Sequence, residues 1–323
     1  MHQTAASVRR PASIMTSHEP SLRRSGFLPL PAVVRAMRPH QWAKNLLVFL
    51  PMLLAQHADA ERVGHAALAF AGFCACASAV YVMNDLADVA ADRKHPRKRH
   101  RPVASGELSR PAAIVAILVL LVAAFALAWS VDRACLTILA VYVATNGAYS
   151  GFLRSQPLVD VIVLSAMYGL RLAMGAAATH TPLSPWLLAF ALFFFTSLAF
   201  AKRYVELRHI EDTEPGEATC RGYARGDSAM VATLGVASGY VSVLVLALYM
   251  NSDQMHTLYG EGGPLWGLCP LMLYWLSRVW LLASRGELHD DPVQFAFTDR
   301  FSLLVGVAAV LVTGLAAWHG PRH

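Results

Sequence analysis

The chain has 323 residues, of which 56% are hydrophobic and 15% are charged, and its formal net charge is +6. Soluble domains usually hold about 45–50% apolar and about 25% charged residues. This composition, with a mean hydropathy of +0.43, excludes an ordinary soluble protein. We interpret the positive charge as a sign of membrane topology and not of nucleic-acid binding.

The N-terminal segment, residues 1–26, is polar and basic and lacks the apolar stretch of a signal peptide. We interpret it as a flexible cytoplasmic tail. The rest of the chain, residues 27–323, shows no second soluble domain and no clear repeat, so we predict that it forms one membrane domain.

Long apolar runs follow one another through that domain. A helix needs roughly 20 apolar residues to cross the hydrocarbon core of a bilayer. The first run is the weakest, because it is short and contains Pro51. The runs that reach or approach the required length are 43–57, 66–84, 111–130, 134–150, 157–178, 185–201, 230–250, 264–283 and 302–318. The sequence therefore predicts an all-α, polytopic bundle of about nine transmembrane helices.

The Lys and Arg residues indicate an orientation, because positive charge is retained on the cytoplasmic side of a membrane. With the N-terminus in the cytoplasm, 22 of the 27 Lys and Arg residues fall in inner segments. The outer segments hold only Arg62, Arg133 and Arg322. We therefore predict a cytoplasmic N-terminus and a site for polar substrates that faces the cytoplasm.

An acidic motif closes the second apolar run. On a helix with about 100° per residue, Asn84, Asp85, Asp88 and Asp92 fit one arc, so their oxygens can converge. Such a group of carboxylates is costly near a membrane unless a cation is present. Mg²⁺ prefers oxygen ligands and combines a few carboxylates with substrate phosphates. We predict that the three Asp side chains hold Mg²⁺ with help from Asn84; the alternative is a solvated acidic helix end.

A basic segment, residues 93–102, follows the motif directly. It would anchor the protein on anionic lipid. Arg and Lys also bind phosphate oxygens, so an acidic metal site followed by this segment suits a polyphosphate. We predict that Arg97, Lys98 and Arg101 bind a phosphorylated substrate.

Charged residues within the fifth run form a second group of candidates. Asp160 and Arg171 are 11 residues apart and would share a helix face, with Tyr168 on the same side. Ionisable groups inside a membrane are functional candidates by default. We predict that Asp160 is catalytic and that Tyr168 and Arg171 bind substrate, and the alternative is a structural polar network between helices.

Two lysines lie near the inner ends of the first and sixth runs. Lys44 and Lys202 are predicted to bind phosphate, because the site needs several cations. The alternatives are interfacial snorkelling for Lys44 and an i, i+4 ion pair of Lys202 with Glu206. Asp290, Asp291 and Asp299 could reach the site from the last inner segment, but we expect that segment to be a solvated loop outside the site.

The acidic motif resembles that of a known superfamily. Asn84-Asp85-x-x-Asp88-x-x-x-Asp92, followed by Arg101-Pro102-Val-Ala-Ser-Gly106, is similar to the first aspartate-rich motif of the UbiA-type intramembrane prenyltransferases. Residues 38–45, 95–102 and 202–207 are most similar to its decaprenyl-phosphate phosphoribosyltransferase branch. The resemblance covers roughly residues 33–318.

This resemblance implies a Mg²⁺-dependent transferase in a bacterial inner membrane, with a cavity that opens to the cytoplasm and is flanked by lipid. Its partners would be a polyprenyl lipid and a phosphorylated small molecule, and a homo-oligomer is left open. The phosphoribosyl branch moves 5-phosphoribose from phosphoribosyl diphosphate to a polyprenyl phosphate. The wider superfamily moves a prenyl group from a prenyl diphosphate to an aromatic acceptor, such as a quinone precursor.

One departure from the superfamily pattern favours the phosphoribosyl branch. Superfamily prenyltransferases carry a second motif, D-x-x-x-D, but here Leu164 stands four residues after Asp160. The branch also carries a Tyr and a basic residue before this Asp, and Tyr149 and Arg154 match them as substrate-binding residues. Prenyl transfer to an aromatic acceptor is the alternative. A transporter without catalysis would explain the spans but not the aspartate motif.

Overall fold

The structure is a computed structural model that describes residues 30–56, 58–213, 221–253, 255, 259, 263–288 and 291–319. Residues 1–31 separate from the unit that begins at Ala32, and everything below concerns that second unit. The predicted tail, 1–26, lies outside the described residues. All regular structure in the described ranges is helical, which confirms the predicted all-α class.

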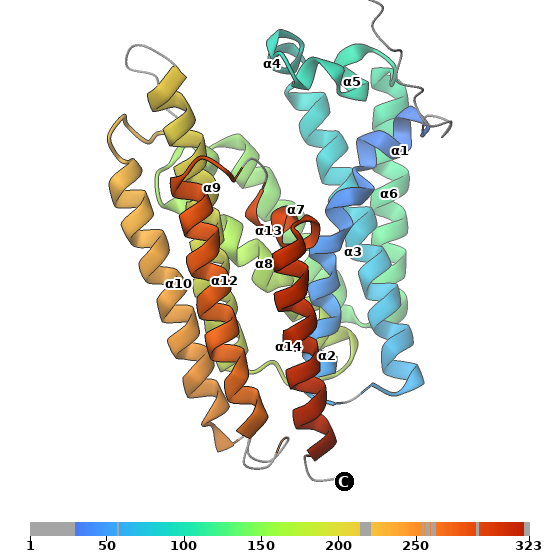
Figure 1. The fold of residues 1–323 in the computed structure, drawn as a ribbon. Coiled ribbons are helices and arrows are strands. Elements are labelled where there is room, and N and C mark those ends of the chain that lie inside the picture. The colour runs from blue at the N-terminus through green and yellow to red at the C-terminus, as the bar shows by residue number, and fades with distance from the viewer. Residues whose placement is uncertain are drawn as a thin grey trace, which may run out of the picture. The chain divides into compact units, whose positions relative to one another are not determined.

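The helices run in chain order through the unit (Figure 1). They are α1 (Ala32–Met37), η1 (Pro39–Phe49), α2 (Leu50–Leu54), α3 (Ala60–Ala87), α4 (Val89–Lys94), η2 (Lys98–His100), α5 (Pro102–Ser105), α6 (Arg110–Val131), α7 (Arg133–Gly151), η3 (Leu153–Ser155), α8 (Val159–Ala178), α9 (Pro185–Thr213), α10 (Ser228–Met250), η4 (Gly263–Gly267), α12 (Leu268–Ser284), α13 (Pro292–Thr298) and α14 (Arg300–His319). Here η denotes a 3₁₀ helix.

Seven of these helical segments are long and apolar enough to cross a membrane, by length and composition: α3, α6, α8, α9, α10, η4 with α12, and α14. They coincide with seven of the nine predicted spans. The predicted span 43–57 is instead the 3₁₀ helix η1 followed by the short α2. The predicted span 134–150 is the continuous helix α7, whose last turns carry the polar residues Asn146, Tyr149 and Ser150.

Polar residues at the membrane surfaces define where the long helices begin. The Asp59 side chain accepts a hydrogen bond from the backbone N–H of Arg62 at the start of α3. Asp132 follows the last residue of α6 and is also the N-cap of α7. Its carboxylate oxygen accepts a hydrogen bond from the backbone N–H of Ala134, with an N–O distance of 2.6 Å. Each of these side-chain caps gives one of the unpaired N–H groups of the first helical turn a partner. The turn between α6 and α7 consists of Asp132 alone.

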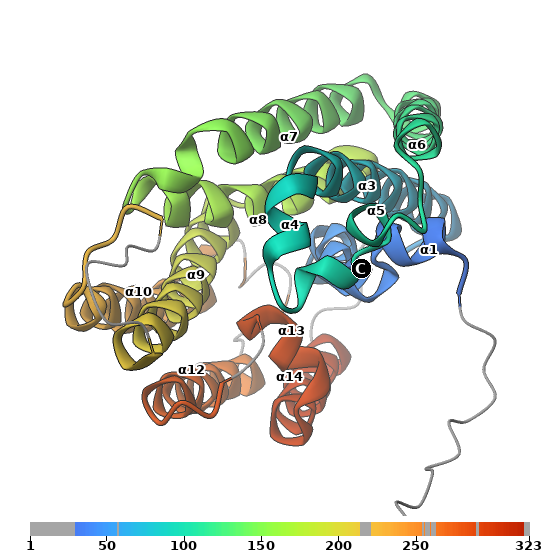
Figure 2. The same cartoon turned by 90° about the horizontal axis from the view of Figure 1, so that it is seen from above.

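Two apolar clusters share α8. One cluster joins α8 to α3, α6, α7 and η1, and the other joins it to α9, α10 and α12. Viewed from above, α8 lies between α7 and α9 (Figure 2). Helices at the periphery, such as α6 and α14, expose apolar side chains, including Val122 at 70% and Val310 at 72%. Exposed apolar surface of this extent fits a multi-span membrane protein.

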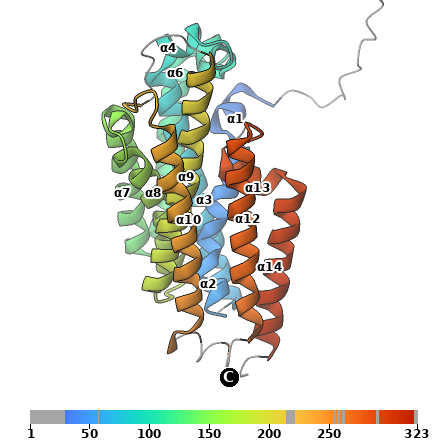
Figure 3. The ribbon, with the colours of Figure 1, turned by 60° about the vertical axis from the view of Figure 1, so that its left-hand side comes forward.

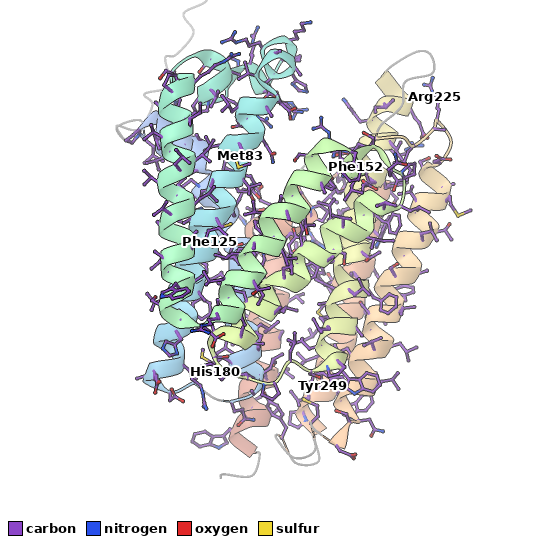
Figure 4. The ribbon with its side chains drawn as sticks, turned by 180° about the vertical axis from the view of Figure 1, so that it is seen from behind. Met83, Phe125, Phe152, His180, Arg225 and Tyr249 are labelled. Carbon is purple, nitrogen blue, oxygen red and sulfur yellow. The ribbon has the colours of Figure 1, made fainter. Side chains whose placement is uncertain are left out.

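The short helices α4 and α5 lie at one end of the long helices, and the last turn of α14 lies at the other (Figures 1 and 3). Figure 4 shows Phe152 and Arg225 at the end that carries α4 and α5, and His180 and Tyr249 at the opposite end. The described basic segment between α4 and α5 lies at the first of these ends. The membrane orientation itself stays a prediction.

A close helix contact depends on a glycine in α8. A Cβ added at Gly175 would lie 1.9 Å from the backbone oxygen of Val48 in η1. We expect Gly175→Ala to lower the stability of the detergent-solubilised protein by about 1–3 kcal/mol, because the helices would be forced apart. Thermal unfolding measures this loss of stability.

Gly169→Ala is the control. A Cβ at Gly169, in the same helix, meets nothing within 4 Å, so this substitution should leave the melting temperature unchanged or raise it. Equal effects of the two substitutions would contradict the contact.

Candidate active site

A cavity of about 520 Å³ lies near the end of the bundle that carries α4 and α5. Its walls come from η1, the end of α3, α7, α8, α9 and the start of α13. The volume falls within the range of small-molecule sites. Its lining is rich in charged groups, whereas most ligand pockets are predominantly apolar.

The cavity has a strong excess of positive charge. The cationic lining residues are Arg38, Lys44, Lys98, Arg101, Arg154, Arg171, Lys202, Arg203 and Arg221. The acidic lining residues are Asp85, Asp88, Glu206 and Asp291. Nine cations face four carboxylates, which leaves an excess of five positive charges. A positively charged site of this kind is suited to polyanionic ligands.

The acidic motif forms one wall, which we call the aspartate wall: Asn84, Asp85 and Asp88. Asp85 accepts a hydrogen bond from Arg38 at 2.6 Å and pairs with Arg101 at 3.1 Å. Asn84 accepts from the Ser150 hydroxyl at 2.9 Å. Asp88 is 37% exposed and lies 3.5 Å from Arg154. Its carboxylate is therefore the most open of this wall.

The fourth member of the motif, Asp92, is buried and does not line the cavity. The helix is interrupted at Asp88, whose ψ of 7° ends α3, and α4 begins at the next residue, so the motif is not on one continuous helix. Arg101 Nη1 nevertheless lies 2.7 Å from Asp92 and 3.1 Å from Asp85, which keeps these two carboxylates close together. The role of Asp92 as a metal ligand stays a prediction.

The residues of the aspartate wall nevertheless suit a hard cation. Among the described residues, no three His, Cys, Asp or Glu side chains lie close enough together to hold a metal ion. Mg²⁺, however, is often bound by one or two carboxylates together with substrate phosphates. Asp85 Oδ2 is buried and has no hydrogen-bond partner in the described part of the chain. A buried carboxylate oxygen without a partner is costly, and a cation at this wall would remove that cost.

Asp160 lies behind the cavity wall and not in it. It is 0% exposed; one carboxylate oxygen accepts from Arg203 Nε at 2.5 Å and the other from the Tyr223 hydroxyl at 2.9 Å. Arg203 also pairs with Glu206. Both oxygens of Asp160 already accept hydrogen bonds. This geometry favours a role for Asp160 in positioning the Arg203 side chain.

Arg203 and a second arginine converge on one phenol. The Tyr149 oxygen accepts hydrogen bonds from Arg203 at 3.2 Å and from Arg221 at 3.1 Å. With two donors on its oxygen, the Tyr149 O–H is left to donate. Because Tyr149 lines the cavity, its hydroxyl can serve as a donor to a ligand there.

Backbone geometry fixes Arg221 in this place. Arg221 and Leu158 both have positive φ values, of 52° and 67°, which are unfavourable for residues with a side chain. A Cβ at Gly222 would lie 2.3 Å from the backbone oxygen of Ser155, so the two loops are in direct contact. Strained backbone of this kind clusters at functional sites. No local sequence pattern around Arg221 indicated its role.

The part of the cavity wall formed by α8 contains a buried arginine, Arg171. Arg171 is 5% exposed and donates to Asn45 at 2.9 Å and to the backbone oxygen of Met167 at 2.6 Å. Its guanidinium lies 5.1 Å from the ring centroid of Tyr168. No carboxylate of the described residues forms an ion pair with it. Arg171 and Tyr168 both line the cavity, as their predicted substrate-binding role requires.

The remaining wall corrects one prediction. Asp291 accepts from Lys44 at 3.1 Å and from Lys202 at 3.2 Å, so it lines the cavity and is not in a solvated loop. In the same region Glu206 forms an ion pair with Arg203. Burial would raise the pKa of Asp291, but Lys202 and Lys44 hold that pKa well below its ordinary value. Asp291 is therefore a permanent anion at neutral pH.

The predicted site residues can now be placed. Those that line the cavity are Lys44, Asn84, Asp85, Asp88, Lys98, Arg101, Tyr149, Arg154, Tyr168, Arg171 and Lys202. Asp92, Arg97 and Asp160 do not line it. Sequence reasoning did not identify Arg203, Arg221 or Asp291 as part of the site. The Asp291-Pro292 pair is typical of a helix N-cap and first turn, so it could have indicated the short helix α13, but it carries no sign of the position of that helix.

Comparison with known proteins gives the following similarities. Residues 45–305 match the UbiA prenyltransferase family. The chain is 37% identical over 290 residues to nodulation protein NoeC of Azorhizobium caulinodans, covering 88% of this chain and 94% of that protein. It is 36% identical over 295 residues to the decaprenyl-phosphate phosphoribosyltransferase of Mycolicibacterium smegmatis, covering 88% and 92%.

Two further similarities concern length and fold. An uncharacterised protein, y4nM, of Sinorhizobium fredii is 38% identical over 84% of this chain, which spans about half (53%) of that protein's length. Among solved structures, a UbiA homologue from Archaeoglobus fulgidus bound to DMAPP and Mg²⁺ matches with a TM-score of 0.65 and 15% identity. That match covers 88% of this chain and 97% of the other, and it shows the fold alone.

Proposed function

The chain belongs to the UbiA prenyltransferase family, and from this premise we propose that it transfers 5-phosphoribose from phosphoribosyl diphosphate to a polyprenyl phosphate. It is a membrane-bound transferase. The similarity to a decaprenyl-phosphate phosphoribosyltransferase along nearly nine-tenths of the chain supports this choice of substrates.

The observation that carries the proposal is the number and distribution of the cations. The cavity has an excess of five positive charges, and its cations include the arginines that contact the aspartate wall, the Arg203–Arg221 pair and the Lys44–Lys202 pair. Phosphoribosyl diphosphate and a polyprenyl phosphate together bring a diphosphate and two phosphomonoesters. A prenyl diphosphate with an aromatic acid brings one diphosphate and one carboxylate. The cation count therefore favours the first pair of substrates.

The engagement of Asp160 supports the same choice. Its oxygens accept from Arg203 and Tyr223, so it is not free to hold a second metal ion. Two guanidinium groups, those of Arg203 and Arg221, face the cavity beside it. In the proposed reaction Arg221 and the Tyr149 hydroxyl bind an anionic group of the donor, while Arg203 keeps Tyr149 in place.

The reaction forms one bond and breaks one bond. An oxygen of the acceptor phosphate attacks C1 of the ribose, the C1–O bond to diphosphate breaks, and its electron pair leaves with the diphosphate. The acceptor is already an anion, so it needs no strong base. Positive charge develops at C1, as in glycosyl transfer, and the cations of the cavity stabilise the departing diphosphate. Mg²⁺, when bound by Asn84, Asp85 and Asp88, would neutralise part of that charge.

We also propose that the cavity opens to the cytoplasm. The basic residues of η2 and of the segment before it lie at the same end of the bundle as the cavity. Positive charge near a membrane is retained on the cytoplasmic side. Phosphoribosyl diphosphate is a soluble polyanion, so it would reach the site from that compartment.

A paired transfer assay on the purified, detergent-solubilised protein tests the proposal. One arm supplies ribose-labelled phosphoribosyl diphosphate, a polyprenyl phosphate and Mg²⁺, and the other supplies a labelled prenyl diphosphate and 4-hydroxybenzoate. We expect label in the lipid fraction of the first arm only, lost with a chelator and restored by Mg²⁺. Prenylated benzoate in the second arm, with the first arm silent, would refute phosphoribosyl transfer.

A further inference from the structure

We propose that the Lys44–Lys202 pair is the subsite for the phosphate of the lipid acceptor, and that Asp291 occupies this subsite until the acceptor displaces it. The inference rests on the proposed function, because it assigns one substrate, a lipid phosphomonoester, to one part of the same cavity. It also gives a role to a carboxylate that the reaction itself does not use.

The first argument is the convergence of two ammonium groups on one oxygen atom. Asp291 Oδ2 lies 3.1 Å from Lys44 Nζ and 3.2 Å from Lys202 Nζ. The lysines come from η1 and α9, far apart in the sequence, so the fold builds a two-cation site for one anionic oxygen. A phosphate oxygen fits the same position, since Lys binds phosphate as a point charge. A phosphomonoester carries up to two negative charges and can replace a carboxylate that carries one.

The second argument is that Asp291 belongs to a separate element. Its other oxygen accepts from the backbone N–H of Val293 at 3.0 Å, at the start of the short helix α13. Gln294 in α13 accepts a hydrogen bond from Gln41 of η1 at 3.1 Å. A small displacement of α13, which would break the Gln41–Gln294 hydrogen bond, would withdraw the carboxylate and leave both lysines in place on η1 and α9.

The third argument is the position of this subsite relative to lipid. Among elements with extensive contacts, α14 packs on η4, α12 and α13. Along α14 the outward side chains are apolar, with Leu304 64% and Val307 57% exposed. A polyprenyl chain can lie along such a surface while its phosphate reaches past Pro292 and Val293, which line the cavity. The aspartate wall, on α3, is left to the diphosphate of the donor.

The variant Asp291→Asn tests the inference, because it removes the internal anion and keeps the side-chain shape. We expect the KM for polyprenyl phosphate to fall about tenfold, which corresponds to about 1.4 kcal/mol, while the KM for phosphoribosyl diphosphate stays within about twofold. An unchanged or higher KM for the acceptor would overturn the inference, because Asp291 would then position the lysines and not compete with phosphate.

Asp299→Asn is the matched control. Asp299 lies at the other end of α13 and pairs with Arg278 at 2.6 Å, away from the cavity. This variant should leave the KM for each substrate unchanged. If Asp291→Asn does not yield folded protein, Lys202→Ala provides the second test, with an expected loss of acceptor affinity of about tenfold or more. Unchanged acceptor affinity in Lys202→Ala would also overturn the inference.

A binding measurement keeps this inference separable from the proposed function. The affinity of the protein for a polyprenyl phosphate, and for the same polyprenol without phosphate, is measured with neither donor nor Mg²⁺ present. We expect Asp291→Asn to bind the phosphate about tenfold more tightly and the polyprenol as the wild type does. Equal phosphate affinity of variant and wild type overturns the inference, whatever the transfer assay shows. Tighter binding in a protein without phosphoribosyl transfer would refute the proposed function alone.

Discussion

Replacing Asp88 with alanine should reduce the transfer rate by about 10²–10³-fold. Asp88 is the carboxylate of the aspartate wall with the most open side chain, and it lies 3.5 Å from Arg154. Asp85, by contrast, is 1% exposed and is held by Arg38 and Arg101. A metal–diphosphate complex that enters the cavity therefore meets Asp88 first. The rate is measured with labelled phosphoribosyl diphosphate over a series of Mg²⁺ concentrations.

Asp92→Asn is the control for this prediction. Asp92 belongs to the same motif but does not line the cavity, and it shares the Arg101 guanidinium with Asp85. Its removal should reduce the rate by about tenfold or less, as is usual for groups that orient a metal ligand or its neighbours, and should leave the Mg²⁺ requirement unchanged. If Asp92→Asn raised the Mg²⁺ requirement as much as Asp88→Ala, the predicted set of three aspartate ligands would hold in the loaded enzyme.

The contrast between Asp88 and Asp92 shows what the sequence could predict about the site. The residue types of the motif indicated a cation and a polyphosphate, because intramembrane carboxylates need a counterion. The predicted arc assumed an unbroken helix. Periodicity does not report the interruption at Asp88, so the placement of Asp92 behind Arg101 depended on the tertiary structure.

The long helices were predictable for a simple reason: apolar runs of membrane length leave few alternatives to a helix. The segments 43–57 and 134–150 show the limit of that reasoning. Both line the cavity, so polar residues such as Lys44 and Asn146 interrupt their apolar pattern. A cavity wall inside a membrane protein has mixed composition, and hydropathy describes it least well.

Long-range ion pairs were beyond sequence reasoning. Asp291 meets Lys44 across 247 positions of the chain, and Arg203 meets Asp160 across 43. No local periodicity predicts such pairs, and the i, i+4 spacing of Lys202 and Glu206 indicated a different partner. Buried ion pairs between distant parts of the chain depend on which helices lie next to each other in the folded protein.

Replacing Asp160 with asparagine should lower the stability of the protein by about 1–3 kcal/mol, because the buried guanidinium of Arg203 loses one of its two carboxylate partners and keeps only Glu206. Arg203 is 1% exposed and Asp160 is 0% exposed, so water cannot compensate for the lost charge. The position of Tyr149 depends on Arg203, so the transfer rate should fall as well. The Mg²⁺ requirement should not change, because neither oxygen of Asp160 faces the cavity.

Thermal unfolding in detergent, combined with a Mg²⁺ titration of the rate, separates this role from metal binding. Tyr223→Phe removes one hydrogen bond to Asp160 and should lower stability by about 1–2 kcal/mol. Asp160→Asn with wild-type stability and a raised Mg²⁺ requirement would instead make Asp160 a metal ligand. The engaged oxygens argue against that result: a metal ion could reach Asp160 only after displacing Arg203, and the loss of one of the two carboxylate partners of this buried cation opposes that exchange.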